Sequence, residues 1–463
     1  MLFLWLLLAL GVPAALAWAD DWPAYLGGVD HRSYSAESVI TPANAATLAP
    51  VWTFKLPSPT GSQPSRLLYA SPTVAGGLVF VGSNTGVLYA RSVTTGARVW
   101  SRNLGYVPAL TCNSRGITAT ATVAPDPARS DAATVYVTSA NDRVFALDAA
   151  TGAVIWHRQV ATVSTTANAY YGWSSPTVVA GHVYVGLASE CDTPLVRGGV
   201  VELDQSTGAV LHRYWSIPAG QVGGSVWSSV AATADGTAVF ATTGNGDEIA
   251  GDNQGDSYSI VRLDGTSMKR KSIWTVPITD RPVDSDFGAS PTLFTATLAG
   301  GPTDLVAACN KNGILYAWKA ATPSTGPVWQ TRIDDDGDIA NCLAATIFDG
   351  TSLYQAGGST TIDGTPVAGS ISKLDPATGA TVWQTALPAQ VIGSGSLDAA
   401  GVLAMPMQDS SATNGGVQLL DASDGTLLTR LGTADVFAQP VFANGYLLVA
   451  SINGTLTAYA PTG

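Results

Sequence analysis

Short runs of alternating apolar and polar residues recur along the whole chain, and each run ends in the same kind of turn. Six of them read "VLYARSVTTGARVW", "VFALDAATGAVIW", "VVELDQSTGAVLHRYW", "ILYAWKAATPSTGPVW", "SKLDPATGATVW" and "VQLLDASDGTLLTRL". In each, a strand-like run leads to a Thr-Gly or Asp-Gly turn and a second strand-like run. Period-two alternation around such a turn is typical of a β-hairpin, because glycine adopts the positive φ that the turn requires. The pattern predicts an all-β protein.

Tryptophans mark the period of this repeat. Further strand-like runs lie between the marks, for example residues 71–83 and 439–451, so each unit contains about four antiparallel strands. A lone unit of this kind cannot bury both of its faces and must stack on its neighbours. We therefore predict an eight-bladed β-propeller with four-stranded blades, in which the tryptophans pack between blades. The marks are Trp52, Trp100, Trp156, Trp215, Trp274, Trp329 and Trp383, spaced 48, 56, 59, 59, 55 and 54 residues apart, with a degenerate eighth copy ending near Leu428.

The two ends of the repeat are incomplete in complementary ways. The first mark, in residues 49–56, has no strands before it, and the last copy, "NGTLTAYAPTG", has none after it. If the N-terminal strand completes the last blade, the ring closes and its open edges disappear. We therefore expect residues 18–463 to form a single propeller domain.

The N-terminus, "MLFLWLLLALGVPAALAWADDW", is typical of an exported protein. Its apolar run ends in Ala15-Leu16-Ala17, which fits the cleavage rule for a signal peptide over residues 1–17. The charged segment that usually precedes the apolar run is missing, so a short membrane anchor is the alternative. No later segment approaches the ~20 apolar residues of a membrane span. We expect a periplasmic or secreted protein.

Charge and cysteine content narrow the function classes. The net charge is −12 and the chain has no basic cluster, which argues against nucleic-acid binding. The chain contains no CxxC or CxxCH motif, so neither a thioredoxin-type site nor covalently attached haem is expected. Four cysteines allow three pairings, and the sequence does not choose among them: Cys112, Cys191, Cys309 and Cys342.

Several insertions break the repeat in blades two to five, near the ends of the predicted inner strands. In a propeller these ends border the axial pocket, which is where such folds usually bind ligands. The insertions are "LTCNSRGITAT", "ASECDTPLVRGG", "GSVWSSV", "ATTGNGDEIAGDNQGD", "VDSDFGASP" and "ACNKNGILY".

The chain resembles the pyrroloquinoline quinone (PQQ)-dependent alcohol dehydrogenases over nearly its whole mature length. Residues 21–54 are similar to that family's W-P-x-Y-G-G-D-x-x-x-x-R-Y-S opening and N-V-x-x-L-x-x-x-W first strand, and "DFGASP" is shared with members that oxidise polyvinyl alcohol. The resemblance implies an eight-bladed propeller with tryptophan-docking repeats. It also implies oxidation of an alcohol, including secondary or polymeric ones, with PQQ and a divalent metal. Electrons would pass to an external acceptor such as a cytochrome c.

The resemblance also implies roles for particular residues. "LASECDTPLVRG" and "TTGNGDE" resemble the segments that bind calcium, which implies Glu190 and Asn245 as ligands. "SVWSSV" resembles the segment whose tryptophan stacks under the quinone, implying Trp227. "CNSRG" and "CNKNGILYAW" resemble the segments whose cations contact the PQQ carboxylate and the quinone oxygens, implying Arg115 and Lys311. These types suit a planar trianion and a hard cation.

Two aspartates in "VDSDFGASP" compete for the role of the base. If Asp286 is the base, it also belongs with the metal ligands Glu190 and Asn245, and the site is of the calcium type. If Asp284 is the base, Asp286 occupies the place of the extra carboxylate that lanthanide-using members carry. Matching Phe287 to the family's aromatic residue favours Asp286 and calcium.

Three departures from the family pattern leave other functions open. The adjacent cysteine pair is absent, the first blade lacks an acidic residue near the PQQ site, and blades seven and eight are short. The alternatives are a non-catalytic propeller that acts as a scaffold and an extracellular propeller that binds a carbohydrate or polymer.

Overall fold

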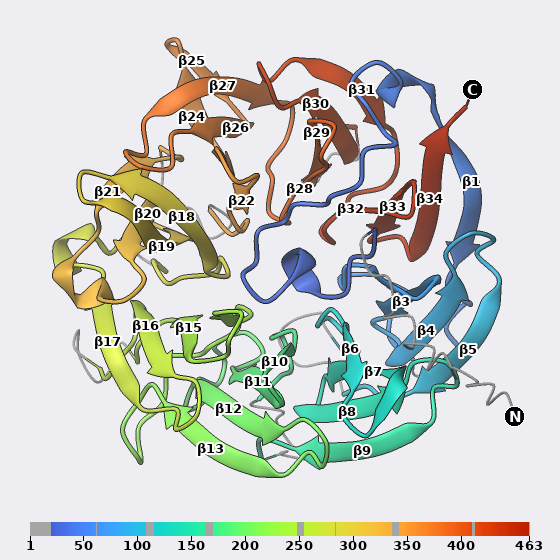
Figure 1. Cartoon of the computed structure of the whole chain (residues 1–463), viewed down its shortest axis with the longest axis horizontal. Helices are drawn as coiled ribbons and strands as arrows, with labels where there is room; N and C mark the ends of the chain where they lie inside the picture. Colours follow the sequence, from blue (N-terminus) through green and yellow to red (C-terminus); the bar gives the residue numbers. More distant parts are fainter. Residues whose placement is uncertain are drawn as a thin grey trace, which may run out of the picture.

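Eight four-stranded antiparallel sheets surround a central axis in the computed structural model (Figure 1). The structure describes residues 20–61, 63–107, 115–162, 170–247, 254–282, 284–335, 342–409 and 413–462. The predicted fold class, an eight-bladed propeller, is confirmed. In the described part of the chain, no helix has the length and apolarity needed to cross a membrane. The predicted signal peptide, residues 1–17, lies outside the described residues.

The blades follow one another along the chain, and each runs from an innermost to an outermost strand. Blade 1 consists of β2 (Thr73–Ala75), β3 (Leu78–Gly82), β4 (Val87–Ser92) and β5 (Arg98–Asn103), and blade 2 of β6 (Thr122–Asp126), β7 (Arg129–Ser139), β8 (Arg143–Asp148) and β9 (Val154–Gln159). Blade 3 consists of β10 (Thr177–Val179), β11 (His182–Leu187), β12 (Gly199–Asp204) and β13 (Val210–Trp215), and blade 4 of β14 (Ala231–Ala232), β15 (Ala238–Thr242), β16 (Ser259–Asp264) and β17 (Arg270–Thr275). Blade 5 consists of β18 (Thr292–Leu298), β19 (Gly301–Asn310), β20 (Ile314–Lys319) and β21 (Trp329–Arg332). Blade 6 consists of β22 (Ile347–Phe348), β23 (Leu353–Gly357), β26 (Gly369–Leu374) and β27 (Thr381–Leu387). Blade 7 consists of β28 (Ser396–Leu397), β29 (Val402–Met407), β30 (Gly416–Asp421) and β31 (Leu427–Leu431).

Blade 8 combines the two ends of the chain. Its strands are β32 (Val441–Ala443), β33 (Tyr446–Ser451), β34 (Thr455–Pro461) and, outermost, β1 (Leu48–Lys55), which pairs antiparallel with β34. The hairpin β24 (Thr360–Ile362) and β25 (Thr365–Val367) and the 3-10 turns η1 (Tyr25–Gly27), η2 (Ala45–Thr47), η4 (Ile278–Asp280) and η5 (Pro323–Thr325) complete the described elements. The sheet of blade 8 joins the N-terminal and C-terminal strands, so the ring has no open edge there.

Five of the seven repeated tryptophans lie over the turn glycine of the next blade; the exceptions are Trp215, before blade 4, and Trp274, which packs on Tyr316 and Trp318 of blade 5. A Cβ atom at Gly152 would lie 2.6 Å from the Trp100 ring, and the Trp100 indole N–H donates to the Ala149 carbonyl at 2.9 Å. The same ring-over-glycine contact joins Trp52 to Gly96, Trp156 to Gly208, Trp329 to Gly379 and Trp383 to Gly425. The glycine is required twice over, because φ is positive and a side chain would meet the indole.

Blade 4 departs from this docking pattern. Met268, with φ 50, stands where the other turns carry glycine, and the Trp215 ring packs instead against the Arg197 guanidinium, 4.4 Å from its centre. Packing between blades is therefore common to the repeat, whereas the partner of the tryptophan is not.

A ring of hydrogen bonds joins the innermost strands around the axis. In each bond, the backbone N–H before one inner strand donates to a Ser or Thr hydroxyl at the same position of the next blade. The bonds run from Gln439 to Ser71 (2.9 Å), Ser71 to Thr120 (3.0 Å), Thr120 to Ser175 (3.0 Å), Ser175 to Ser229 (2.9 Å), Ser229 to Ser290 (2.9 Å) and Ala345 to Ser394 (3.0 Å).

The N-terminal segment, residues 20–40, runs across the axis and is bonded to most of the inner strands (Figure 1). Its carbonyls accept backbone N–H groups from β6, β14, β18, β22 and β28, and Trp22 forms a two-way bridge with Val74 in β2. Its His31 side chain is buried and bonds the Pro291 carbonyl at 3.0 Å. The segment thus ties together blades that are far apart in the sequence.

Candidate active site

The loops of blades 3, 4 and 5 bring most of the candidate residues to one end of the axis. Glu190 follows β11, Asn245 follows β15 and Lys311 follows β19, so all three come from the turn after the second strand of a blade. Asp284, Asp286 and Trp227 lie in the segments that lead into the innermost strands β18 and β14. Equivalent positions of successive repeats therefore supply the site.

Asp286 is buried and has a protein partner on each carboxylate oxygen. Its Oδ2 accepts a hydrogen bond from the Trp227 indole at 2.9 Å, and its Oδ1 lies 2.6 Å from the Lys311 ammonium. Burial raises the pKa of the Asp286 carboxyl above its ordinary value; Lys311 opposes the rise and Asp284 adds to it. Each oxygen retains a lone pair for a further donor.

Lys311 bridges the two aspartates that compete for the base role. Its ammonium lies 3.1 Å from both oxygens of Asp284 and 5.3 Å from the centre of the Trp227 ring. Burial alone would lower the pKa of Lys311, but Asp286 and Asp284 outweigh this and raise it. The ammonium therefore stays charged between two carboxylates.

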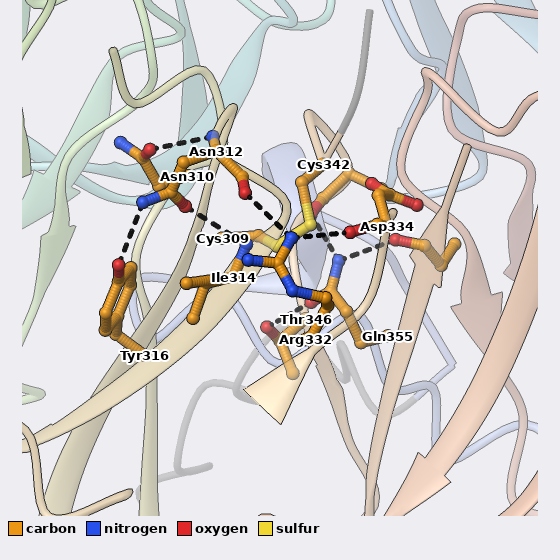
Figure 2. The surroundings of a disulfide bond; sticks show 12 residues. Cys309, Asn310, Asn312, Ile314, Tyr316, Arg332, Asp334, Cys342, Thr346 and Gln355 are labelled. Carbon is orange, nitrogen blue, oxygen red and sulfur yellow. Dashed lines mark hydrogen bonds between the residues drawn. A yellow bond between two sulfur atoms is a disulfide. The ribbon is translucent and has the colours of Figure 1, made fainter. Parts of the chain in front are cut away.

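The turn that carries Lys311 is fixed on both sides. The Lys311 N–H donates to the Asp286 carbonyl at 3.1 Å, and the Asn310 side chain donates to the Ser285 carbonyl at 2.8 Å. Next to the turn, Cys309 forms a disulfide with Cys342, which leads into blade 6 (Figure 2). This is one of the pairings that the sequence left open. Cys191 is also disulfide-bonded, and Cys112 lies outside the described residues.

Asn245 joins blade 4 to its neighbours on either side. Its amide nitrogen donates to Asp284 Oδ1 at 2.7 Å and to Asp192 Oδ2 at 3.1 Å. Asp192 belongs to the turn of Glu190 and was missed in the sequence, because a single acidic residue in an insertion has no periodic signal. The clue was its place in "ASECDTPLVRGG", the insertion that carries Glu190.

Glu190 is a buried carboxylate without a hydrogen-bond partner among the described residues. It is 4% exposed, and neither of its oxygens has a donor within the described residues. Burial raises the pKa of Glu190 to about 7, and Arg115 opposes the rise. Its backbone carbonyl accepts from the Trp173 indole at 3.0 Å. An orphaned buried carboxylate is costly unless a cation or proton satisfies it.

Arg115 lies apart from this group. Its guanidinium packs 5.5 Å from the centre of the Tyr106 ring and its Nε donates to the Val107 carbonyl at 3.1 Å. It precedes β6 of blade 2, and its charge opposes the rise in the pKa of Glu190. The structure therefore brings together Asp284, Asp286, Asn245, Lys311 and Trp227 by direct contacts.

An axial cavity of about 110 Å³ lies below Trp173 and Trp227. Two layers line it. One is the hydrogen-bonded ring that includes Ser175, Ser229 and Ser290; the other comes from the residues two positions earlier, namely Tyr69, Thr118, Trp173, Trp227, Gly288, Leu343, Ile392 and Phe437. A Cβ at Gly288 would lie 2.5 Å from the Trp227 ring, so this glycine makes room for the indole. Tyr25 of the N-terminal segment also contacts the cavity.

The donor set fits a hard cation. Glu190 offers two unpartnered oxygens, and the amide oxygen of Asn245 is not used by the two bonds that its nitrogen makes. The described residues contain no group of three or more His, Cys, Asp or Glu arranged to hold a metal.

Comparison with known proteins places the chain in a family. Residues 22–332 match the model of the glucose/ethanol/alcohol dehydrogenase β-propeller domain, the PQQ family. The chain belongs to this family. Residues 367–463, from the last strands of blade 6 through blade 7 to β34 of blade 8, match the model described as outer membrane protein assembly factor BamB, and this range contains none of the candidate site residues.

Two curated relatives and one solved structure illustrate the similarity. The chain is 27% identical over 350 residues to a quinohemoprotein alcohol dehydrogenase of Comamonas testosteroni, covering 66% of this chain and 46% of that one. It is 24% identical over 260 residues to a polyvinylalcohol dehydrogenase of a Pseudomonas species, covering 50% and 37%. A europium-containing methanol dehydrogenase has the same fold, with a TM-score of 0.75 at 15% identity over 96% of this chain and 98% of that one. The chain therefore spans about half or less of the length of the two curated relatives.

Proposed function

We propose that the protein is a PQQ-dependent alcohol dehydrogenase with Asp286 as its base. The observation that carries this proposal is the buried Asp286 carboxylate, held between the Lys311 ammonium and the indole of Trp227, a residue that also lines the axial cavity. A carboxylate fixed in this way accepts a proton from an alcohol hydroxyl without first reorienting.

The residues around Asp286 match the needs of the cofactor. The Trp227 ring forms an aromatic platform, and Lys311 and Arg115 supply positive charge for the quinone oxygens and a carboxylate of PQQ. Glu190, Asn245 and Asp286 would hold the metal. We favour calcium over a lanthanide because the residue two positions after the base is Gly288 and not a further carboxylate. When bound, PQQ supplies the two-electron acceptor and the metal supplies Lewis-acid polarisation.

Lys311 keeps Asp286 ionised and aligned. Its charge opposes the effect of burial on the pKa of Asp286 and so favours the ionised carboxylate. Asp284 shares the same ammonium and holds the amide of Asn245. We assign Asp284 to this supporting role and Asp286 to proton transfer.

Substrate, acceptor and location follow from the family. We propose a secondary or polymeric alcohol as substrate, since one relative is a polyvinylalcohol dehydrogenase. An external carrier such as a cytochrome c would take the electrons, because the chain has no motif for covalent haem. We propose a periplasmic or secreted location, reached with the signal peptide over residues 1–17.

A titration of the metal-stripped protein with PQQ tests this proposal. Calcium or lanthanum is added in parallel, and quinone absorbance and tryptophan fluorescence are followed. We expect saturable, metal-dependent binding that quenches Trp227, and dye-linked alcohol oxidation by the loaded protein. Absence of binding with either metal would instead favour a scaffold or polymer-binding propeller.

A further inference from the structure

Asp192 contacts the candidate site but has no part in the function proposed above. It has a positive φ of 55 in the turn after β11. Its Oδ1 accepts from the Ser189 hydroxyl at 2.6 Å, and that hydroxyl lies 3.2 Å from Ser225 Oγ. Its Oδ2 faces Asn245. Asp192 is thus anchored within blade 3 while it reaches into blade 4.

The two carboxylates around Asn245 determine which way its amide points. Asp192 Oδ2 and Asp284 Oδ1 lie 3.1 and 2.7 Å from the amide nitrogen. Ionised carboxylates only accept hydrogen bonds, so the NH₂ group must face them, and both of its hydrogens are used. A flipped amide would place its oxygen against two negative charges and leave two donors unpaired. The amide oxygen is therefore directed away from both aspartates.

We infer that Asp192 is a positioning residue that, together with Asp284, orients the Asn245 carboxamide so that its oxygen faces the bound cation. This inference rests on the proposed function, in which Asn245 is a metal ligand. It also gives blade 3 two acids with different tasks. Glu190 offers unpartnered oxygens to the cation, whereas both Asp192 oxygens already accept hydrogen bonds.

Two variants of Asp192 separate orientation from charge. Asp192→Asn keeps an oxygen that can accept the Asn245 N–H but loses the negative charge, whereas Asp192→Ala loses both. If Asp192 acts by orientation, Asn retains most of the metal affinity and Ala does not. If Asp192 acts only by attracting the cation, both substitutions weaken binding alike.

Calorimetric titration of the metal-stripped full chain with calcium, with and without saturating PQQ, measures this directly. For Asp192→Ala we expect a 10- to 100-fold weaker calcium affinity, the usual effect of losing a group that orients a metal ligand. Asp192→Asn should stay within about threefold of the wild type, which is a small change on that scale. In an Asn245→Ala background, Asp192→Ala should have no further effect, because the residue acts through Asn245.

Asp363→Ala is the matched control for backbone effects. Asp363 also has a positive φ, of 49, but is exposed in the β24–β25 hairpin away from the axis. Both alanine variants should lose similar thermal stability, and only Asp192→Ala should lose calcium affinity. Equal calcium affinities of wild type and Asp192→Ala, or equal losses in the Asn and Ala variants, would overturn the inference alone. Failure of the wild type to bind calcium even with PQQ would overturn the proposed function and the inference with it.

Discussion

Blades 1 and 5 have the same turn after their second strand, yet only the blade 5 turn contributes candidate chemistry. In both, a glycine with φ near 80 donates its N–H three residues back at 2.9 Å, from Gly86 to Ser83 and from Gly313 to Asn310. Asn84 of blade 1 uses its side-chain oxygen to hold the backbone N–H groups of Arg115 and Gly116. Lys311, at the equivalent position of blade 5, instead places a charge between Asp284 and Asp286.

The comparison separates what the repeat supplies from what individual residues supply. The strand pairing, the turn and its glycine are shared by both blades. They therefore position whichever side chain follows the second strand. The chemistry depends on a few side chains at those positions in blades 3 to 5. Changes to either part should therefore have different consequences.

Asp286→Asn should have the largest effect, because it removes the base and leaves the scaffold intact. We expect dye-linked alcohol oxidation to fall about 10²- to 10⁴-fold, the usual contribution of a general base. The asparagine keeps one oxygen that can accept from Trp227 but loses the charge of a proposed metal ligand, so PQQ binding, followed by tryptophan fluorescence, should weaken less than the activity falls. Activity within a few-fold of wild type would contradict the role of Asp286.

Gly152→Ala tests the scaffold instead. A Cβ there would lie 2.6 Å from Trp100 at a φ of 68, so we expect a loss of about 2–4 kcal/mol in the free energy of unfolding. Gly76→Ala is the control. Its φ is 58 but nothing lies within 4 Å, so only the backbone cost of about 1–2 kcal/mol applies. Equal losses in denaturant titrations would show that the tryptophan contact adds nothing.

Lys311→Asn gives blade 5 the residue of blade 1. Loss of the ammonium removes what opposes the raised pKa of Asp286, so that pKa rises further. Since the ionised carboxylate is the active form, the acid limb of the pH–rate profile should move to higher pH. Lys271→Asn, at an exposed lysine paired with Asp264, should leave the profile unchanged. The same profile for both variants would argue against Lys311 as the tuning charge.

His31 gives blade 5 another contact that blade 1 lacks, and it should make stability depend on pH. Burial lowers the pKa of His31 to about 4, while the bond to Pro291 opposes this. The unfolded chain therefore binds more protons between about pH 6.5 and 4, so stability is lost as pH falls through that window. At pH 5 the loss should be about 1–2 kcal/mol.

The His31→Asn variant isolates this contribution. Asparagine tolerates the positive φ of 59 at this position and does not titrate. Unfolding measured at pH 7 and pH 5 should show a smaller loss for His31→Asn than for the wild type. Parallel losses would assign the acid sensitivity to other groups.

The sequence alone predicted the fold, because every copy of the repeat carries the same pattern. The alternation, the turn glycines and the tryptophan spacing each indicated a four-stranded blade. They also predicted the packing of Trp52, Trp100 and their equivalents between blades. Blade 4, where Met268 replaces the glycine, shows the limit of this signal. A local exception cannot be read from the average repeat.

The site was less accessible to sequence alone. The resemblance named Asp284, Asp286, Asn245, Lys311 and Trp227, and the structure shows them in contact. The hydrogen bonds that connect these residues join neighbouring blades, and the spacing of residues along the sequence does not predict them. Asp192 illustrates this best, since its partner Asn245 is 53 residues away and belongs to another blade.

The N-terminal segment has a consequence for the time course of folding. Leu26 donates to Gln439 across 413 residues, and Leu48 pairs with Pro461. Contacts this distant in the chain require closure of almost the entire polypeptide before they form, and such closure slows folding. During synthesis, the N-terminal residues can form these contacts only after the C-terminal residues have been made. The contacts across the axis and the β1–β34 pairing therefore form only when the whole chain is available. A chain truncated before β34 would have an open ring.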